Sequence, residues 1–191
     1  MKKGIIFISG RGSNMESILK ESRNGILKGL LEIPLVFSNN PQAPGLKIAE
    51  ENGIKTAAIS SRGKSREIFD KEVIQEIEKY LPDYIILAGY MRILSPEFIR
   101  KYQGKIINIH PADTRLHQGL NGYKWAFENG LPETKITVHF VDEGLDTGEI
   151  IGLEKVDLSG VESLEEVEKR GLATEHRFYP EMLKKIITNQ S

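Results

Sequence analysis

The chain has 191 residues, of which 39% are hydrophobic and 28% charged, an ordinary balance for a globular protein. Its net charge is −1, from 26 basic and 27 acidic residues with no long block of either sign, which argues against nucleic-acid binding through a basic face. It contains no cysteine, so disulfides, thiolate nucleophiles and cysteine-based metal sites are excluded.

Apolar runs alternate with helical patterns from the N-terminus onward. Strands are expected at 4–9, 33–38, 56–60, 84–88 and 105–110, and helices at 14–22, 45–52 and 65–80. This alternation predicts a parallel sheet with helices on both faces, an α/β fold.

The last third of the chain changes character. Strands at 136–141 and 150–156 are joined by the glycine-rich loop 142–148 without a helix between them, which predicts an antiparallel addition to the sheet. A long helix follows from Ser163, whose Ser-x-x-Glu pattern with Glu166 is a capping box. Pro180 either kinks that helix or begins a second one.

Linkers, repeats and membrane-length apolar runs are missing from the sequence. The start, MKKGIIFISG, reaches a glycine turn too soon for a signal peptide and is interpreted as a first strand. We therefore expect a single domain over residues 1–191 in the cytoplasm, with no membrane partner. The four histidines are scattered, so no metal is expected.

A glycine turn at residues 10–14, GRGSN, lies between the first strand and the first helix. Backbone N–H groups in such a turn, at a helix N-terminus, favour a phosphate. The dinucleotide fingerprint is incomplete, because Met15 stands where the third glycine is expected and no Walker lysine follows. A simple turn capped by Ser13 or Asn14 is an equal alternative.

Asn108 and His110 are two residues apart in a predicted strand, so their side chains face the same way. Pro111 places His110 at the strand's end, which in a parallel sheet is the edge where ligands bind. An amide and an imidazole aimed at one point suit the oxyanion of an acyl transfer. By itself the motif favours the alternative, a hydrogen-bonded strand-end pair.

The loop 142–148 carries three carboxylates. It is either a solvated hairpin loop or a loop with one carboxylate turned inward. Paired with His110, that carboxylate would raise the pKa of the imidazole and make it a general acid near neutral pH. His139, on the incoming strand, is interpreted with a slight preference as a partly buried strand histidine rather than as a supporting residue of the site.

The segment 88–95, AGYMRILS, follows a buried strand. Its apolar side chains beside Arg92 suit a flat heterocycle, while Ser95 and Pro96 alternatively cap a short helix. Arg66 begins the third predicted helix and pairs with a ligand carboxylate or is simply solvated.

The order of these motifs carries more information than each motif alone. The series GRGSN, VFSN, LAGYMRILS, NIHP, QGL, VHFVDEGLDTG and EHRFYP resembles the folate-dependent formyltransferases, in particular the branch that formylates glycinamide ribonucleotide in purine biosynthesis. The resemblance extends from Ile5 to about Pro180. It implies a Rossmann-type three-layer domain with a mostly parallel mixed sheet and an antiparallel C-terminal addition.

The resemblance also implies a set of site residues. The catalytic residues would be Asn108, His110 and Asp146. The substrate's phosphate would lie at Gly12, Ser13 and Asn14, and the second substrate would contact Glu175. The implied folate site comprises Arg66, Met91, Arg92, Ile93, Leu94, Asn108, Val141, Asp142, Glu143, Gly144 and Leu145.

By this resemblance the co-substrate is 10-formyltetrahydrofolate and no metal takes part. The amine of glycinamide ribonucleotide would attack the formyl carbon, and Asn108 with a protonated His110 would stabilise the oxyanion. Asp146 would keep His110 protonated and oriented. The expected partners are these two small molecules, no nucleic acid, and at most a second copy of the chain in a homodimer.

The chain departs from the family pattern close to His110. Residues 112–115 read Ala-Asp-Thr-Arg where a Ser-Leu-Leu-Pro-like run is usual, and Asn121 and Tyr123 stand where histidines are usual. These departures concern the amine, so a formyltransferase acting on a different small amine is the main alternative.

Other readings fit the sequence less well. The methionyl-tRNA, sugar-amine and formyl-folate hydrolase branches resemble chains with further domains. A non-catalytic nucleotide- or folate-binding module would not need all three catalytic residue types, and a dehydrogenase would need the full glycine fingerprint.

Overall fold

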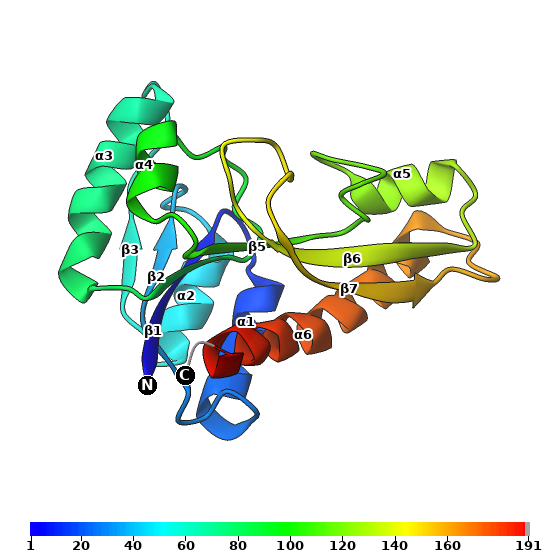
Figure 1. Ribbon diagram of the computed structural model, residues 1–191, viewed down its shortest axis with the longest axis horizontal. Helices are drawn as coiled ribbons and strands as arrows, with labels where there is room; N and C mark the ends of the chain where they lie inside the picture. The colour runs from blue at the N-terminus through cyan, green and yellow to red at the C-terminus, as the bar shows by residue number, and fades with distance from the viewer. Residues whose placement is uncertain (190–191) are drawn as a thin grey trace.

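The computed structural model describes residues 1–189 and contains one seven-stranded sheet in the order β3-β2-β1-β4-β5-β6-β7 (Figure 1). The strands are β1 Lys2–Ile8, β2 Leu31–Ser38, β3 Thr56–Ala58, β4 Tyr84–Leu87, β5 Ile106–His110, β6 Glu133–Phe140 and β7 Ile150–Asp157. The helices are α1 Ser13–Asn24, α2 Pro44–Glu51, α3 Arg66–Ile77, the 3₁₀ turn η1 Glu78–Tyr80, α4 Pro96–Lys101, α5 Gly122–Glu128 and α6 Leu164–Asn189.

The sheet is mixed. Strands β1 to β5 are parallel to one another, whereas β6 pairs antiparallel with β5, and β7 antiparallel with β6. The predicted fold class, a mostly parallel sheet with an antiparallel C-terminal addition, is therefore confirmed.

Each face of the sheet is covered by its own hydrophobic cluster. Ile6 and Ile8 of β1 face one cluster together with α1, α5 and α6. Ile5 and Phe7, the alternate residues of the same strand, face a second cluster with α3 and α4. Because side chains in a strand alternate between faces and both faces are covered, this central strand has no polar side chain from Gly4 to Ile8. Figure 1 shows α3 and α4 on the side of the sheet opposite to α1, α2 and α6.

The C-terminal helix differs from its prediction in two details. It runs through Pro180 as one helix, so the second-helix alternative is wrong. The Ser163 hydroxyl accepts from the Glu166 N–H at 3.2 Å, but the Glu166 carboxylate accepts from Glu162 N–H rather than from Ser163. The capping box is thus only half formed.

Helix α5 was absent from the prediction. It has only seven residues, begins with a glycine, and follows Asn121 in a left-handed conformation at φ +64°. Neither feature is a usual helix start signal. Helix α4, by contrast, was one of the two readings of Ser95 and Pro96, and the Ser95 hydroxyl caps it by accepting from Phe98 N–H.

None of the helices between residues 1 and 189 combines the length and the apolar character needed to cross a membrane.

Candidate active site

The end of β5 places Asn108 and His110 at the border between the parallel and antiparallel parts of the sheet. In the register with β6, Asn108 lies opposite His139, and His110 lies opposite Thr137. The Asn108 amide nitrogen is 3.4 Å from His139 Nε2, and the imidazole of His110 is almost fully buried. Three polar side chains from neighbouring strands therefore meet at one point.

Asp146 completes this group from the loop between β6 and β7. Its backbone has φ +53°, in the left-handed region, and its side chain is only 11% exposed because it turns inward. Its carboxylate lies 3.5 Å from His110 Nδ1 and 3.5 Å from His139 Nε2. Of the two interpretations of this loop, the inward-turned carboxylate is the one that the structure has.

His139 is more than a partly buried strand residue. It is 2% exposed and faces both Asn108 and Asp146 through Nε2, while its Nδ1 lies 2.8 Å from the Phe140 carbonyl. The slight preference for an ordinary strand histidine was therefore wrong, because His139 belongs to the same group as Asn108, His110 and Asp146. The alternation of side chains along the strand had already placed it on the same face as Thr137.

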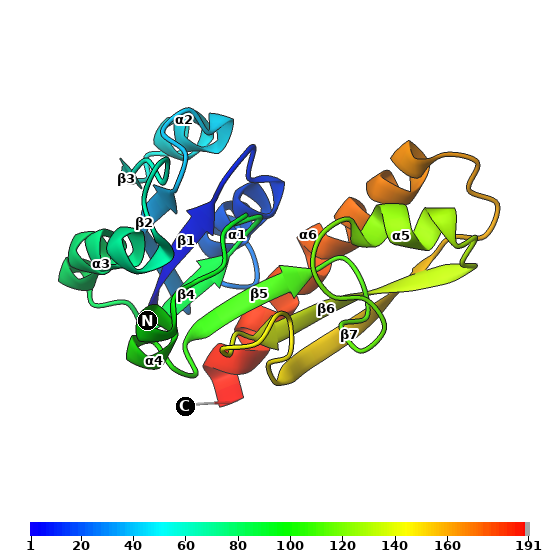
Figure 2. The same cartoon turned by 90° about the horizontal axis from the view of Figure 1, so that it is seen from above.

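Figure 2 shows that the loop following β5 lies beside the loop between β6 and β7. The Gly119 N–H donates to Asp146 Oδ2 at 2.9 Å, and the His117 carbonyl lies 3.1 Å from His110 Nε2. The ring of His117 stacks on Trp125, with centroids 4.8 Å apart. These contacts come largely from backbone groups, and no sequence signal pointed to them.

The electrostatics of the His110–Asp146 pair differ from the sequence prediction. Burial lowers the pKa of His110 below its ordinary value, and the Asp146 carboxylate and the His117 carbonyl offset this only in part. The predicted upward shift is therefore wrong, because desolvation of the imidazolium outweighs its attraction to one carboxylate. Burial also opposes ionisation of Asp146, but hydrogen bonds from His139 and Gly119 outweigh it and lower the pKa of Asp146. At neutral pH the pair is thus a neutral imidazole beside a carboxylate.

The hydrogen-bond partners of His110 favour one tautomer. With the proton on Nε2, the ring donates to the His117 carbonyl and leaves the Nδ1 lone pair next to Asp146. A proton arriving at Nδ1 then makes an imidazolium that donates to both oxygens. The arrangement is therefore suited to take up one proton at Nδ1 and release it again.

The predicted phosphate segment lies on the helix α1 start. Gly12, at φ +75°, is the N-cap and offers no side-chain cap, so a ligand's oxygens can meet the first free N–H groups. Asn14 is buried, and its Nδ2 donates to Glu175 Oε2 at 2.5 Å. The hydroxyl of Tyr123 donates to the other carboxylate oxygen of Glu175. Burial raises the pKa of Glu175, against the effect of both donors.

The residues predicted to hold the folate are spread over four segments, one of which is Asn108 on β5. Met91 and Ile93 are exposed, at 66% and 61%, while Leu94 is buried in the core below them. The Arg92 guanidinium lies 4.5 Å from the centre of the Phe69 ring. Arg66 lies at the start of α3 and pairs with Glu67.

The loop between β6 and β7 supplies the remaining predicted folate residues. Asp142 accepts from Gly144 N–H and from the Thr147 hydroxyl, and Glu143 pairs with Arg100 at 3.2 Å. Leu145 is half exposed, whereas the backbone of Val141 continues the pairing with β5 through Ile106. The loop is therefore braced by its own side chains and reaches over the end of β5.

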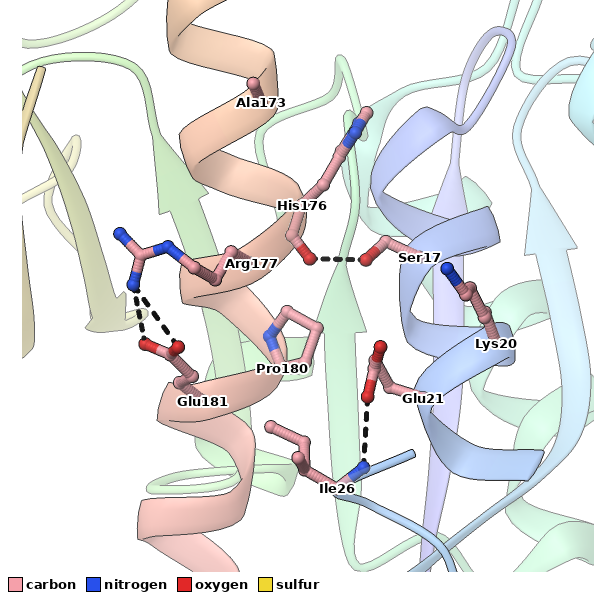
Figure 3. Close-up of a pocket in the computed structure, with 9 residues that line it drawn as sticks. All are labelled: Ser17, Lys20, Glu21, Ile26, Ala173, His176, Arg177, Pro180 and Glu181. Atoms are coloured by element: carbon pink, nitrogen blue, oxygen red, sulfur yellow. Dashed lines mark hydrogen bonds and ion pairs between the residues drawn. The ribbon is translucent and has the colours of Figure 1, made fainter. Parts of the chain in front are cut away.

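A pocket of about 360 Å³ lies between α1 and α6, outside the His110 group (Figure 3). Its lining mixes cations, Lys20 and Arg177, with anions, Glu21 and Glu181, so its charge indicates no ligand class. A neighbouring hollow of about 430 Å³ reaches Ser13 and is lined by Arg11, Lys20 and His176, and also by Glu16, which pairs with Arg11. Within residues 1–189 no cluster of three or more His, Asp or Glu side chains is arranged to hold a metal ion.

Several known proteins have a similar sequence over most of this chain. The family described as formyl transferase matches residues 2–183. Phosphoribosylglycinamide formyltransferase of Escherichia coli (strain K12) is 41% identical over 177 residues, which are 92% of this chain and 82% of that protein. The trifunctional purine biosynthetic protein adenosine-3 of Drosophila melanogaster is 36% identical over 97% of this chain, which corresponds to 14% of its own length.

The fold has a close counterpart among solved structures. The crystal structure of phosphoribosylglycinamide formyltransferase from Bacillus halodurans superposes with a TM-score of 0.93 at 34% identity. The alignment covers 100% of this chain and 97% of the other.

Proposed function

Since the chain belongs to the formyl transferase family, we propose that it transfers a formyl group from 10-formyltetrahydrofolate to the amine of glycinamide ribonucleotide in purine biosynthesis. The observation that carries this proposal is the convergence of Asn108, His110 and Asp146 at the end of β5. An amide donor, a proton carrier and a carboxylate are the groups that acyl transfer to an amine requires. In this role the whole chain acts as one domain in the cytoplasm.

The first step is attack of the glycinamide nitrogen on the formyl carbon. Negative charge develops on the formyl oxygen, and the Asn108 amide donates a hydrogen bond to it. The neutral ring of His110 accepts the proton that the attacking nitrogen loses, at Nδ1. The resulting imidazolium is stabilised by Asp146, 3.5 Å away.

The second step breaks the bond between the formyl carbon and N10 of the folate. His110 returns its proton to N10, so that tetrahydrofolate leaves as a neutral amine and the product is a formamide. A low pKa of His110 helps this step, because a weakly basic imidazole gives up its proton readily. The ring ends neutral, as it began.

The two substrates would enter from different sides. The exposed apolar side chains of Met91, Ile93 and Leu145 offer a surface for the folate's ring system. The phosphate of the amine substrate would meet the α1 N-terminus at Ser13, where Arg11, Lys20 and His176 line the adjoining hollow.

Glu175 contributes indirectly to the part of the site proposed to bind the phosphate of the amine substrate. Both of its carboxylate oxygens accept hydrogen bonds from the protein, from Asn14 and Tyr123, and its side chain is buried. We assign Glu175 the role of fixing the side chain of Asn14 within the phosphate segment.

The proposal is tested by following tetrahydrofolate release with 10-formyltetrahydrofolate and a panel of amines. Glycinamide ribonucleotide should support turnover that is lost in His110→Ala, whereas glycinamide without the ribose phosphate should be a poor substrate. Folate binding without turnover on glycinamide ribonucleotide would contradict the amine assignment and leave formyl transfer to another amine to be tested with the same panel.

A further inference from the structure

The loop at residues 111–121 supplies a backbone partner to each member of the His110–Asp146 pair. The His117 carbonyl lies 3.1 Å from His110 Nε2, and the Gly119 N–H donates to Asp146 Oδ2 at 2.9 Å. A proton carrier works only in the right tautomer, and a carboxylate only in the right rotamer. The shape of this loop therefore affects the tautomer of His110 and, together with His139, the rotamer of Asp146.

Asp113 holds the loop in that shape. It is only 4% exposed and accepts a bidentate pair of bonds from Arg115, at 2.8 and 2.7 Å. Its own carbonyl accepts from the N–H groups of Leu116 and His117, so the turn that carries the His117 carbonyl begins at this residue. The bonds from Arg115 hold the pKa of Asp113 well below its usual range, and the carboxylate stays ionised at any physiological pH.

Strand β6 ties the same loop to the sheet. Lys135 reaches Asp113 Oδ2 at 3.3 Å. Thr137 donates to the Ala112 carbonyl at 2.6 Å and accepts from Thr114 N–H at 3.3 Å. Residues two apart on a strand share a face, so the face that holds the loop is the same one that carries His139 to Asp146. Strand β6 thus anchors the loop and also supplies the His139 side chain that faces Asp146.

We propose that Asp113, together with Arg115 and Lys135, is a positioning residue that keeps His110 in its Nε2–H tautomer. The three side chains, called here the Asp113 brace, hold the His117 carbonyl next to Nε2 of His110. Nδ1 then carries no proton of its own and can accept the transferred one. Asp113 and Arg115 of the brace belong to the loop itself and Lys135 belongs to β6, so ion pairs both hold the loop in shape and tie it to the sheet. This inference rests on the proposed function only for its activity readout.

Few charged or titratable groups face His110, so the ¹⁵N signals of its ring can be assigned to its tautomer without interference from many neighbours. They are Asp146 from the β6–β7 loop, His139 from β6 and His117 from the loop itself. The brace acts on His110 through the loop, directly by the His117 carbonyl at Nε2 and indirectly by the Gly119 N–H that holds Asp146.

The test is imidazole ¹⁵N NMR of the wild type and of Arg115→Ala at a pH where His110 is neutral, with the signals assigned through His110→Gln. Arg115 is exposed on 59% of its side chain, so its loss should leave the fold intact. The wild type should show one tautomer, protonated at Nε2. Arg115→Ala and Asp113→Asn should show averaged signals of both tautomers, and kcat should fall roughly 10- to 100-fold, as for a displaced catalytic group, with the KM for the folate unchanged.

A matched control is Arg170→Ala. Arg170 also bonds one carboxylate, Glu166, and two loop carbonyls, at Asp157 and Ser159, but none of these belongs to the site. It should lower thermal stability without altering the His110 signals. An unchanged His110 tautomer in Arg115→Ala and Asp113→Asn, whatever happens to kcat or stability, would overturn the proposal. Because the NMR signals need no substrate, failure of the proposed amine substrate would not affect this result.

Discussion

His110 Nδ1 lies 3.5 Å from the Asp146 carboxylate while its Nε2 lies 3.1 Å from the His117 carbonyl. Both ring nitrogens thus face oxygen acceptors inside a site where burial disfavours the charged ring. A neutral ring satisfies one acceptor, and a protonated ring satisfies both. Burial disfavours the imidazolium, whereas the second acceptor favours it. His110 therefore gains a proton briefly and loses it readily, as formyl transfer between two nitrogens requires.

Asp146→Asn should lower kcat by roughly 10²–10⁴-fold, the usual range for losing the support of a general acid–base group. An amide in place of the carboxylate no longer stabilises the imidazolium that forms during transfer. Formyl-folate affinity, measured by calorimetry, should remain. Asp157→Asn is the control, because this exposed carboxylate bonds only its own turn at Ser159. Equal activity of Asp146→Asn and wild type would contradict this role.

The pH profile of kcat/KM should rise through a pKa below the ordinary histidine value of about 6.5. Burial lowers the pKa of His110, and the neutral ring is the form that accepts the proton, so activity is lost only at pH values below that lowered pKa. A stopped assay from acid to neutral pH measures this acid limb of the profile, and the residual activity of His110→Gln should show no such limb. A limb above the ordinary value would show that the imidazolium is the resting form.

Folding stability should also follow His110. Because its pKa is lower in the folded state than in the unfolded chain, the unfolded chain binds more protons between the two values, and stability rises with pH across that window. The window lies below about 6.5. Urea unfolding at several pH values should show this slope in the wild type and a weaker one in His110→Gln. An identical slope in both proteins would speak against the lowered pKa.

Tyr123→Phe should cost about 1–3 kcal/mol of unfolding free energy, the usual penalty when a buried acceptor loses its donor. Its hydroxyl is one of the two donors to the buried Glu175 carboxylate, with Asn14 the other. Tyr80→Phe is a control, since Tyr80 contacts Lys79 through its ring. Chemical denaturation measures the difference. A loss no larger than that of Tyr80→Phe would mean that Glu175 does not depend on Tyr123.

Gly171→Ala should destabilise the protein, although alanine normally favours a helix over glycine by about 1 kcal/mol. A methyl group at this position of α6 would lie 2.2 Å from Tyr123 Cζ, so the ring or the helix must shift. In a Tyr123→Ala background the same change should cost much less, because the ring is gone. A stabilising effect in the wild-type background would show that α5 and α6 do not pack as closely as described.

The fold was readily predicted from the sequence because its strands are strongly apolar and regularly spaced. Ile6 and Phe7 are both fully buried, on opposite faces of the sheet, which is why the first strand reads as a continuous apolar run. Helix α5 escaped detection since its first residue, Gly122, and the left-handed Asn121 before it give no start signal. The apolar pattern of the sequence thus predicted the strands, but it missed α5, a short helix without start signals that packs against α6.

Only those parts of the candidate site that consist of side chains could be predicted from the sequence. Asn108, His110 and Asp146 have motifs of their own, and the structure brings them together. The contributions of His117 and Gly119 come from a carbonyl and an N–H group, which every residue possesses. The direction of the His110 pKa shift was missed for a related reason: burial is a property of the packed fold, and no short motif encodes it.

Formyl transfer to glycinamide ribonucleotide is tested most directly by following the formyl carbon itself. Folate carrying a ¹³C-labelled formyl group is mixed with glycinamide ribonucleotide and the protein, and ¹³C NMR identifies where the label goes. We predict that the label appears as a formamide on the glycinamide nitrogen, at a rate that collapses in His110→Ala. Label that stays on the folate, or that appears as free formate with the amine unchanged, would contradict the account.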